Sequence, residues 1–221
     1  DLIIGNSNSL SNNLKNFIGT KVHTIYNPCF FPKKKKRKKI LKKNYSTILN
    51  VARLENQKDQ LTLIKAIHNL KKKEKSKIKV IIVGYGSLLK SLNNYIKLNN
   101  LQKIIKIYPN VSDVTKFYSQ ADLFILSSLY EGFPNVLVEA AEYDIPIIST
   151  NCNSGPNEIL SNGKGGYLVN KKDYLLMSKR IEFFLDSKKE FIKKAKFCKK
   201  KLNRFDNKKN IKKFDNLFES L

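Results

Sequence analysis

Residues 121–140 read ADLFILSSLYEGFPNVLVEA, and this stretch contains the repeating unit of the fold. Its four consecutive apolar residues, 123–126, are typical of a strand that is buried on both faces. The polar turn that follows ends at Pro134, which suits the first position of a helix because that position needs no N–H. The stretch therefore predicts a strand, a turn and a helix in succession.

The same alternation extends in both directions from this stretch. Apolar runs alternate with segments in which leucine and isoleucine recur at helical spacing. The further runs cover residues 47–51, 78–83, 104–107 and 145–148. Continuous apolar strands separated by helices are typical of a parallel sheet with helices on both faces. We therefore expect an α/β fold, a Rossmann-like doubly wound parallel sheet, over residues 45–203.

The segments outside this domain differ from it in composition. Residues 1–31 predict a strand, a helix and a second strand. Residues 32–44 are almost entirely basic, which is typical of a solvated linker, and a final helix is expected over 204–221. Because the chain begins at Asp1 inside a predicted strand, we expect it to be part of a longer protein.

The net charge of +25 arises from 43 lysine and arginine residues against 18 acidic residues. Such an excess attracts polyanions, including nucleic acid, anionic lipid and nucleotide diphosphates. A basic nucleic-acid-binding protein is therefore one alternative. The basic residues are mostly lysines spread over every predicted helix, without interleaved aromatic residues, which argues against nucleic acid as the main partner. An AT-rich genome would produce the same lysine excess, so charge alone decides little.

Cysteine spacing and hydropathy narrow the class of protein. Cys29, Cys152 and Cys198 are isolated from one another, which predicts neither a disulfide framework nor a zinc site. No apolar run approaches the roughly 18 residues that a membrane span needs. We therefore expect a protein of a reducing compartment, the cytoplasm.

Two cations follow the predicted strand at residues 47–51. In a sheet of this kind ligands bind at the carboxyl ends of the strands, where Arg53 and Lys58 would lie beside the start of the next helix. An arginine fork, a lysine ammonium and a helix N-terminus all favour phosphate oxygens. The pair indicates a diphosphate site, although both residues could equally be solvated surface cations.

A glycine-containing loop follows the strand at residues 78–83. Gly84 and Gly86 would let the backbone approach a ligand closely. The dinucleotide fingerprint is incomplete because Leu89 stands where its third glycine would be. A ligand loop and a plain tight turn explain this pattern about equally well.

The loop after residues 123–126 carries two carboxylates, Glu131 and Glu139, with seven residues between them. Glu131 is expected in the loop and Glu139 about a turn and a half into the following helix. The backbone amides of residues 132–136 would crown the N-terminus of that helix and face the phosphate site. Two carboxylates at different depths could contact different parts of one extended ligand, or each could have a purely structural role.

Five motifs in this order resemble the family 4 retaining glycosyltransferases, which have the two-domain GT-B fold. The motifs are Ala52-Arg53-Leu54 with Lys58, Val83-Gly84-x-Gly86, Ala121-Asp122-Leu123-Phe124-Ile125, Glu131-Gly132-Phe133-Pro134, and Glu139-Ala140. The resemblance covers about residues 22–169 and implies that the chain is the C-terminal, donor-binding half of such an enzyme. Residues 1–31 would then be the tail of the N-terminal domain and the strand between the domains.

The resemblance also implies a role for each matched residue. Arg53 and Lys58 would hold the donor's diphosphate, and Glu131 would contact the donor sugar, so these three are the expected catalytic residues. Glu139 would accept hydrogen bonds from the ribose hydroxyls. The remaining expected donor-binding residues are Gly84, Gly86, Val111, Gly132, Phe133, Pro134, Asn135 and Val136. Fixed cations can stabilise a departing nucleoside diphosphate, so neither a metal nor a separate cofactor is expected.

Three segments refine this expectation. Tyr143-Asp144-Ile145-Pro146 and Tyr108-Pro109-Asn110 both lack a glycine that the family usually has, which puts the packing of one turn and the fit to the nucleobase in doubt. The turn at residues 153–159 resembles relatives that act on surface polysaccharides and lipid-linked oligosaccharide precursors. We therefore expect a UDP-hexose or UDP-N-acetylhexosamine donor, with a GDP-sugar left open.

We do not expect this chain to contain the binding site for the acceptor. A saccharide or polyprenyl-linked acceptor would bind through an N-terminal domain of which only the tail is expected here. The chain would then be the donor half of a bacterial enzyme, with an inactive or split fragment that only binds nucleotide as an alternative. A nucleotide-sugar epimerase is disfavoured because related epimerases carry a different acidic constellation. The lysine excess also suggests contact with the anionic inner face of the cytoplasmic membrane.

Overall fold

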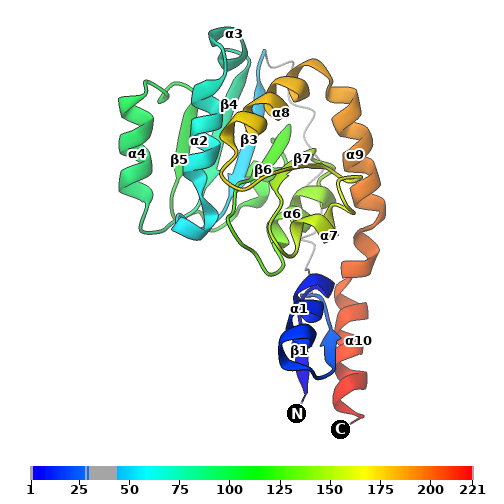
Figure 1. Ribbon diagram of the computed structural model, residues 1–221. Helices are drawn as coiled ribbons and strands as arrows, with labels where there is room; N and C mark the ends of the chain where they lie inside the picture. The colour runs from blue at the N-terminus through cyan, green and yellow to red at the C-terminus, as the bar shows by residue number, and fades with distance from the viewer. Residues whose placement is uncertain (1, 28, 30–43, 221) are drawn as a thin grey trace.

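The computed structural model describes residues 2–27, 29 and 44–220, and its centre is a six-stranded sheet in the order β5-β4-β3-β6-β7-β8 (Figure 1). Every neighbouring pair is parallel, so the carboxyl ends of all strands lie at one edge. The strands are β3 (Ser46–Val51), β4 (Ile78–Val83), β5 (Ile105–Tyr108), β6 (Leu123–Leu126), β7 (Ile147–Thr150) and β8 (Tyr167–Val169). The chain order reverses between β3 and β6, which is the point where open α/β sheets bind ligands.

Helices cover both faces of this sheet, as the doubly wound fold predicts. Successive residues of β3 point to opposite faces, so Ile48 and Leu49 belong to two different apolar clusters. The Ile48 side is covered by α2 (Gln60–Asn69), α4 (Leu89–Leu98) and α8 (Tyr174–Asp186). The Leu49 side is covered by α5 (Thr115–Tyr118), α6 (Asn135–Glu142) and the end of α9 (Lys188–Lys200). Shorter helices are η1 (Asn56–Lys58), α3 (Lys72–Lys75), α7 (Pro156–Ile159) and η2 (Leu202–Phe205).

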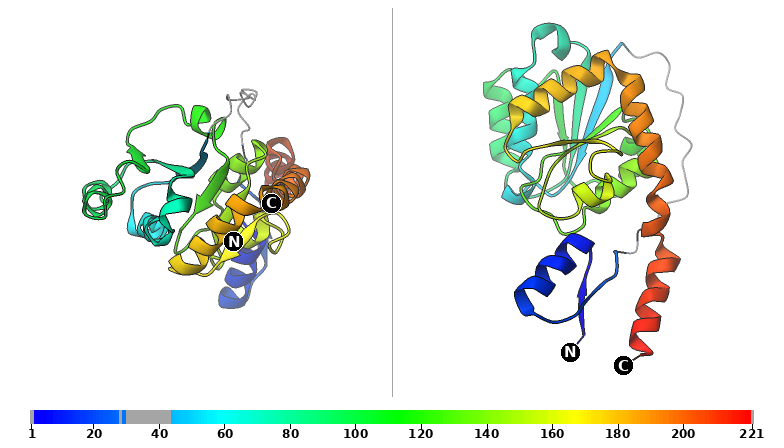
Figure 2. Two further views of the ribbon diagram at one scale, coloured as in Figure 1. Left: turned by 90° about the horizontal axis from the view of Figure 1, so that it is seen from above. Right: turned by 45° about the vertical axis from the view of Figure 1, so that its right-hand side comes forward.

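A small βαβ unit lies against the carboxyl edge of the large sheet (Figure 2). It consists of β1 (Ile3–Gly5), α1 (Asn8–Ile18) and β2 (Val22–Thr24), with β1 and β2 parallel. The side chain of Ser7 caps α1 by accepting a hydrogen bond from the Leu10 amide, and Gly19 ends the helix with φ 76°. The Ser9 hydroxyl donates to the Asn153 carbonyl at 2.7 Å, which joins the unit to the loop after β7.

The C-terminal helix returns to this small unit. After α9 and η2, α10 (Asn207–Phe218) runs beside α1 and β1, so the two ends of the chain lie at the same end of the molecule (Figure 1). An isolated parallel bridge pairs Cys29 with Asp206, so the segment leaving the small unit and the segment returning to it are bonded side by side. Among the described residues, no helix is both long and apolar enough to cross a membrane.

The predicted fold class is confirmed, and the differences from expectation are local. Strand β7 begins at Ile147 rather than at Ile145, because the Ile145 amide donates to the Ala140 carbonyl at 3.1 Å and so closes the turn after α6. Strand β8 was not predicted, since it has only three residues and no long apolar run. The expected basic linker at 32–44 falls, except for its last residue, outside the described part of the chain.

Candidate functional site

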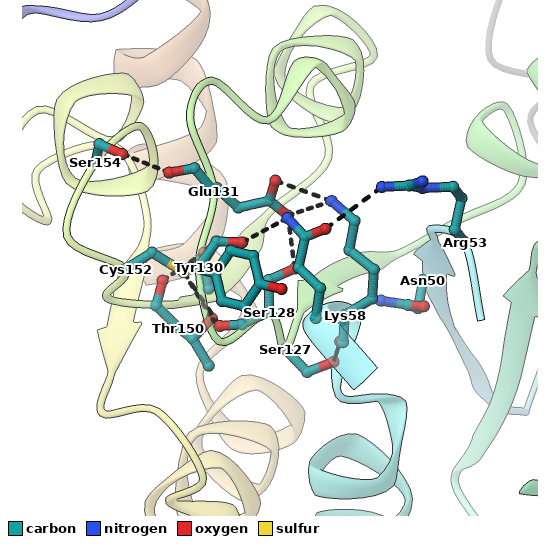
Figure 3. Close-up of polar contacts among 12 residues, drawn as sticks. Asn50, Arg53, Lys58, Ser127, Ser128, Tyr130, Glu131, Thr150, Cys152 and Ser154 are labelled. Atoms are coloured by element: carbon teal, nitrogen blue, oxygen red, sulfur yellow. Dashed lines mark hydrogen bonds and ion pairs between the residues drawn. The ribbon is translucent and has the colours of Figure 1, made fainter. Parts of the chain in front are cut away.

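The predicted site residues lie after β3, β4, β5 and β6 and in the first turns of α6, and Arg53, Lys58 and Glu131 are at the point where the strand order reverses (Figure 3). Arg53 and Lys58 follow β3, and Lys58 ends the short helix η1. Glu131 follows β6 and lies opposite Lys58 (Figure 3). Adjacent parallel strands end side by side, so residues 73 positions apart in the sequence come into contact.

Lys58 and Glu131 form a largely buried ion pair. The lysine Nζ donates to both carboxylate oxygens of Glu131, at 2.7 and 2.9 Å. Their side chains are 15% and 6% exposed, so the pair is poorly screened by solvent. An ammonium group has three N–H donors, and two of them are used here. One donor of Lys58 is therefore left for another acceptor.

Serine and glutamine side chains hold the loop that carries Glu131. The Ser128 hydroxyl donates to Glu131 Oε1 at 2.6 Å, and the Ser154 hydroxyl donates to the Glu131 carbonyl. Gln57 Nε2 donates to the Tyr130 carbonyl at 2.9 Å. Sequence reasoning missed these supports, because single serines and glutamines carry no periodic signal.

Arg53 is exposed and joins this cluster indirectly. Its guanidinium donates to Gln57 Oε1 at 3.4 Å, which leaves most of the fork directed to solvent. The Arg53 carbonyl accepts from Gln60 Nε2 at 2.8 Å, which fixes the backbone at this position while the side chain is exposed. A fixed backbone that carries an exposed guanidinium suits the capture of an anion.

Gly84 and Gly86 permit a close backbone contact between the loops after β3 and β4. A Cβ on Gly84 would lie 1.8 Å from the Ala52 carbonyl oxygen, and one on Gly86 would lie 2.4 Å from the Leu54 carbonyl oxygen. Real Cβ atoms do not approach so closely, so both positions require glycine. The close approach is to the protein's own backbone, which supports the tight-turn interpretation and holds the Arg53 loop in place.

The carboxylate of Glu55, in the loop after β3, binds the turn after β4. Glu55 accepts hydrogen bonds from the backbone amide and the hydroxyl of Ser87, at 2.9 and 2.8 Å. These bonds lower the pKa of Glu55, because they stabilise its charged form. Glu55 was not among the predicted site residues, and its role in this structure is to join the β3 and β4 loops.

Helix α6 begins at Asn135, so Pro134 is its N-cap rather than its first residue as expected. Pro134 has ψ 92°, an extended value, and the helical conformation starts one residue later. The Phe133 side chain is buried in the core, so Phe133 could line a ligand only through its backbone, whereas the partly buried Val136 packs against the same cluster. The exposed Asn135 accepts from Asn27 Nδ2 at 3.4 Å. Helix geometry thus leaves the N-terminal amides of α6 at the carboxyl edge of the sheet.

Glu139 lies within α6 and is bonded to Tyr118 rather than to the Lys58–Glu131 pair. The Tyr118 hydroxyl donates to Glu139 Oε2 at 2.7 Å. Burial, followed by the charge of Glu139, raises the pKa of Tyr118 well above its usual value, so the phenol stays a hydrogen-bond donor. Tyr118 was not predicted, and it fixes the orientation of the second carboxylate.

The turn at Tyr143-Asp144, whose packing the sequence left in doubt, is packed against the same tyrosine. The rings of Tyr143 and Tyr118 stack with centroids 5.5 Å apart. Asp144 has φ 55° and its carboxylate pairs with Lys199 of α9. The doubt about the packing of this turn is therefore resolved, since an aromatic stack and an ion pair fill the place.

The loop expected to meet the nucleobase follows β5. Asn110 has φ 53° and is exposed, whereas Val111 packs against the core cluster on the α6 side of the sheet. The two histidines, His23 in β2 and His68 in α2, lie outside the site. Within residues 2–27, 29 and 44–220, no group of three or more histidine, cysteine or acidic side chains is arranged to hold a metal ion.

Comparison with known proteins gives a family match. The sequence profile described as "Glycosyl transferases group 1" matches residues 32–204. An uncharacterized glycosyltransferase from Methanocaldococcus jannaschii is 36% identical over 129 residues, which are 58% of this chain and 31% of that protein. A second relative, from Campylobacter jejuni, is 27% identical over 179 residues, covering 80% of this chain and 49% of its own length. Its name is GalNAc-alpha-(1->4)-GalNAc-alpha-(1->3)-diNAcBac-PP-undecaprenol alpha-1,4-N-acetyl-D-galactosaminyltransferase.

Solved structures share the fold. HepE of Anabaena, crystallised in complex with UDP, superposes with a TM-score of 0.87 at 20% identity, over 100% of this chain and 64% of that chain. At this identity the likeness shows the fold alone, which is part of a GT-B structure. The chain spans less than two thirds of the length of each of these proteins.

Proposed function

The chain belongs to the glycosyl transferases group 1 family, and from that premise we propose that it binds the nucleotide-sugar donor of a retaining, metal-independent glycosyltransferase. The observation that carries the proposal is the Lys58–Glu131 ion pair at the reversal point of the sheet, with Arg53 joined to it through Gln57. Cations at this edge suit a diphosphate, and a carboxylate beside them suits a sugar hydroxyl.

The nucleotide sugar would bind through N–H groups that the hydrogen bonds within the protein leave unused. The third N–H of Lys58 and the exposed fork of Arg53 would take the phosphate oxygens. The amides at the start of α6 would add further donors through the backbone of residues 132–136. As the bond between the sugar and the diphosphate breaks, these groups would stabilise the negative charge that develops on the leaving group.

The carboxylates of Glu131 and Glu139 would bind different parts of the nucleotide-sugar donor. Glu131, held by Lys58 and Ser128, would accept a hydrogen bond from the sugar. Glu139, oriented by Tyr118, would accept from the ribose hydroxyls. The residues that would line the donor beside them are Gly84, Gly86, Val111, Gly132, Phe133, Pro134, Asn135 and Val136. Val111 would meet the nucleobase through its main chain, because its side chain packs inward.

The donor proposed is a UDP-hexose or UDP-N-acetylhexosamine, and the acceptor a polysaccharide or lipid-linked saccharide. HepE binds UDP, and the Campylobacter relative is named for a transfer onto an undecaprenol-linked saccharide. The acceptor would bind through a part of the enzyme outside this chain, consistent with the partial coverage of its relatives. A cytoplasmic location, with the lysine excess drawn to an anionic membrane surface, would bring the site to such an acceptor.

The test is a calorimetric titration of the 221-residue chain with UDP and, separately, with GDP. We expect UDP to bind, and Arg53→Ala and Glu139→Ala each to weaken binding about tenfold or more, because each removes charged hydrogen bonds. Lys196→Ala, an exposed cation on α9, is the matched control and should bind as the wild type does. A folded wild-type chain that binds neither nucleotide would overturn the proposal, and binding of GDP alone would overturn the choice of base.

A further inference from the structure

Tyr26, just after β2, contacts several segments that are distant from it in the sequence. Its ring lies 5.6 Å from that of Phe133, in the loop after β6, and 4.9 Å from that of Phe205, in η2. Phe133 and Phe205 are themselves 5.0 Å apart in an edge-to-face arrangement. Such tilted and edge-to-face aromatic contacts are specific in geometry as well as apolar, so they fix relative positions.

The hydroxyl of Tyr26 takes part in two hydrogen bonds. It donates to Glu158 of α7 and accepts from Asn8 Nδ2 at 2.7 Å. Asn8, at the start of α1, also donates to Glu158 from its backbone amide and its side chain, at 3.1 and 2.8 Å. Burial and then the Glu158 carboxylate raise the pKa of Tyr26, so the phenol remains protonated.

The loop that Tyr26 contacts is the loop that carries Glu131. Phe133 is two residues after Glu131 and two before the first residue of α6. Gly155, with φ 85°, packs against the same loop, since a Cβ there would lie 2.4 Å from Pro134 and 2.8 Å from the Gly132 carbonyl. The loop at residues 131–134 is therefore contacted both by the turn after β7 and by Tyr26.

We infer that Tyr26 is a positioning residue for the candidate donor site. Through Tyr26, the position of the small βαβ unit would determine the position of the loop at residues 131–134. The inference rests on the proposed function, and it adds a residue outside the family profile match. In this role Tyr26 would not touch the ligand. It acts through Phe133, whose displacement would shift the Glu131 carboxylate and the amides that begin α6.

The experiment compares UDP affinity and stability in the 221-residue chain. Tyr26→Leu removes both the ring and the hydroxyl, Tyr26→Phe removes the hydroxyl alone, and Phe133→Leu removes the partner ring. Tyr167→Leu is the matched control, because the Tyr167 ring packs at 4.4 Å on Phe191 in the other apolar cluster. Calorimetry gives the dissociation constant of UDP, and urea unfolding gives the stability of each variant.

We expect Tyr26→Leu and Phe133→Leu each to weaken UDP binding by about fivefold to tenfold, a typical size for coupling between separate sites. Tyr167→Leu should change affinity less than about twofold while losing a comparable amount of stability. The double variant Tyr26→Leu/Phe133→Leu should bind little worse than either single variant, since both remove the same contact. A purely structural role for Tyr26 predicts no such difference from Tyr167.

Two outcomes separate this inference from the function on which it rests. A wild-type chain that binds UDP, with a folded Tyr26→Leu variant of unchanged affinity, would overturn the inference and leave the donor site standing. A folded wild type without affinity for UDP would overturn both. If Tyr26→Leu fails to fold, Tyr26→Phe decides: a loss of about threefold supports the positioning role, and unchanged affinity overturns it.

Discussion

The β3–β4 side of the candidate site and its β6–α6 side are held in place by different means. On the β3–β4 side, the glycine backbone at Gly84 and Gly86 lies directly against the carbonyls of Ala52 and Leu54. On the β6–α6 side, the loop at residues 131–134 is held by side chains, among them Ser154 after β7 and Tyr26 after β2. Close glycine contacts occur on both sides, since Gly155 also lies against Pro134 and Gly132, but the second side depends in addition on a hydroxyl and a ring from the segments after β7 and β2.

The two kinds of support tolerate substitution differently. A backbone contact that excludes any Cβ allows almost no substitution, but it depends on few neighbours. A loop held by several hydrogen bonds and ring contacts tolerates the loss of one of them, but it responds to movements elsewhere in the molecule. The cations of the site lie on the first side and the carboxylates on the second.

Gly84→Ala should have the largest effect. The added Cβ would lie 1.8 Å from the Ala52 carbonyl oxygen, so the backbone of one loop must move. We expect a loss of about 3 kcal/mol or more in the free energy of unfolding, measured by urea denaturation. Gly19→Ala is the control, because Gly19 has φ 76° but nothing within 4 Å of a Cβ, and should cost about 1 kcal/mol. Equal losses at both positions would show that the close approach does not fix the β3–β4 side.

Lys58→Met tests the pair that joins the two sides. It leaves the 6% exposed Glu131 carboxylate without its cation, and we expect a loss of roughly 2 kcal/mol in unfolding free energy at neutral pH. Adding Glu131→Gln to this variant should recover part of the loss, because the uncompensated charge is removed. The comparison is Lys193→Met at the exposed Lys193–Glu190 pair, whose side chains are 74% and 52% exposed, with an expected change under about 0.5 kcal/mol. Similar losses at the two pairs would mean that burial of the first pair has no energetic weight.

Ser154→Ala and Ser87→Ala compare a single hydroxyl on each side, and they should give the smallest effects. Ser154 is 8% exposed and donates to the Glu131 carbonyl, so its loss leaves a poorly solvated acceptor and should cost about 1 kcal/mol. Ser87 is exposed, and its backbone amide continues to bind Glu55, so its loss should cost less than about 0.5 kcal/mol. Urea unfolding of both variants measures the difference, and a larger loss at Ser87 would reverse the contrast drawn between the two sides.

The sequence predicted the parts of this structure that follow from local pattern. The strands at residues 47–51, 78–83 and 123–126 were recognisable because buried parallel strands are continuous apolar runs. Strand β8 escaped prediction because three residues cannot establish a pattern, and its pairing with β7 is a long-range choice. The shift of the α6 start from Pro134 to Asn135 is of the size expected when only propensity guides the boundary.

The candidate site, like the fold, has residues that the sequence predicts and residues that it does not. Arg53, Lys58, Glu131 and Glu139 were predicted from their positions after strands, and the contact between Lys58 and Glu131 follows from the pairing of β3 with β6. The partners that orient the carboxylates, Ser128 and Tyr118, could not be predicted, because a hydrogen bond between side chains depends on a distance that only the folded chain defines.

The bridge between Cys29 and Asp206 has a mechanical consequence. It holds the segment that follows β2 against the segment that leads into α10, so a shift of one would be passed to the other. Tyr26, three residues before Cys29, is bonded to Glu158 and packs on Phe133, so such a shift would reach the loop of Glu131 through direct ring contact.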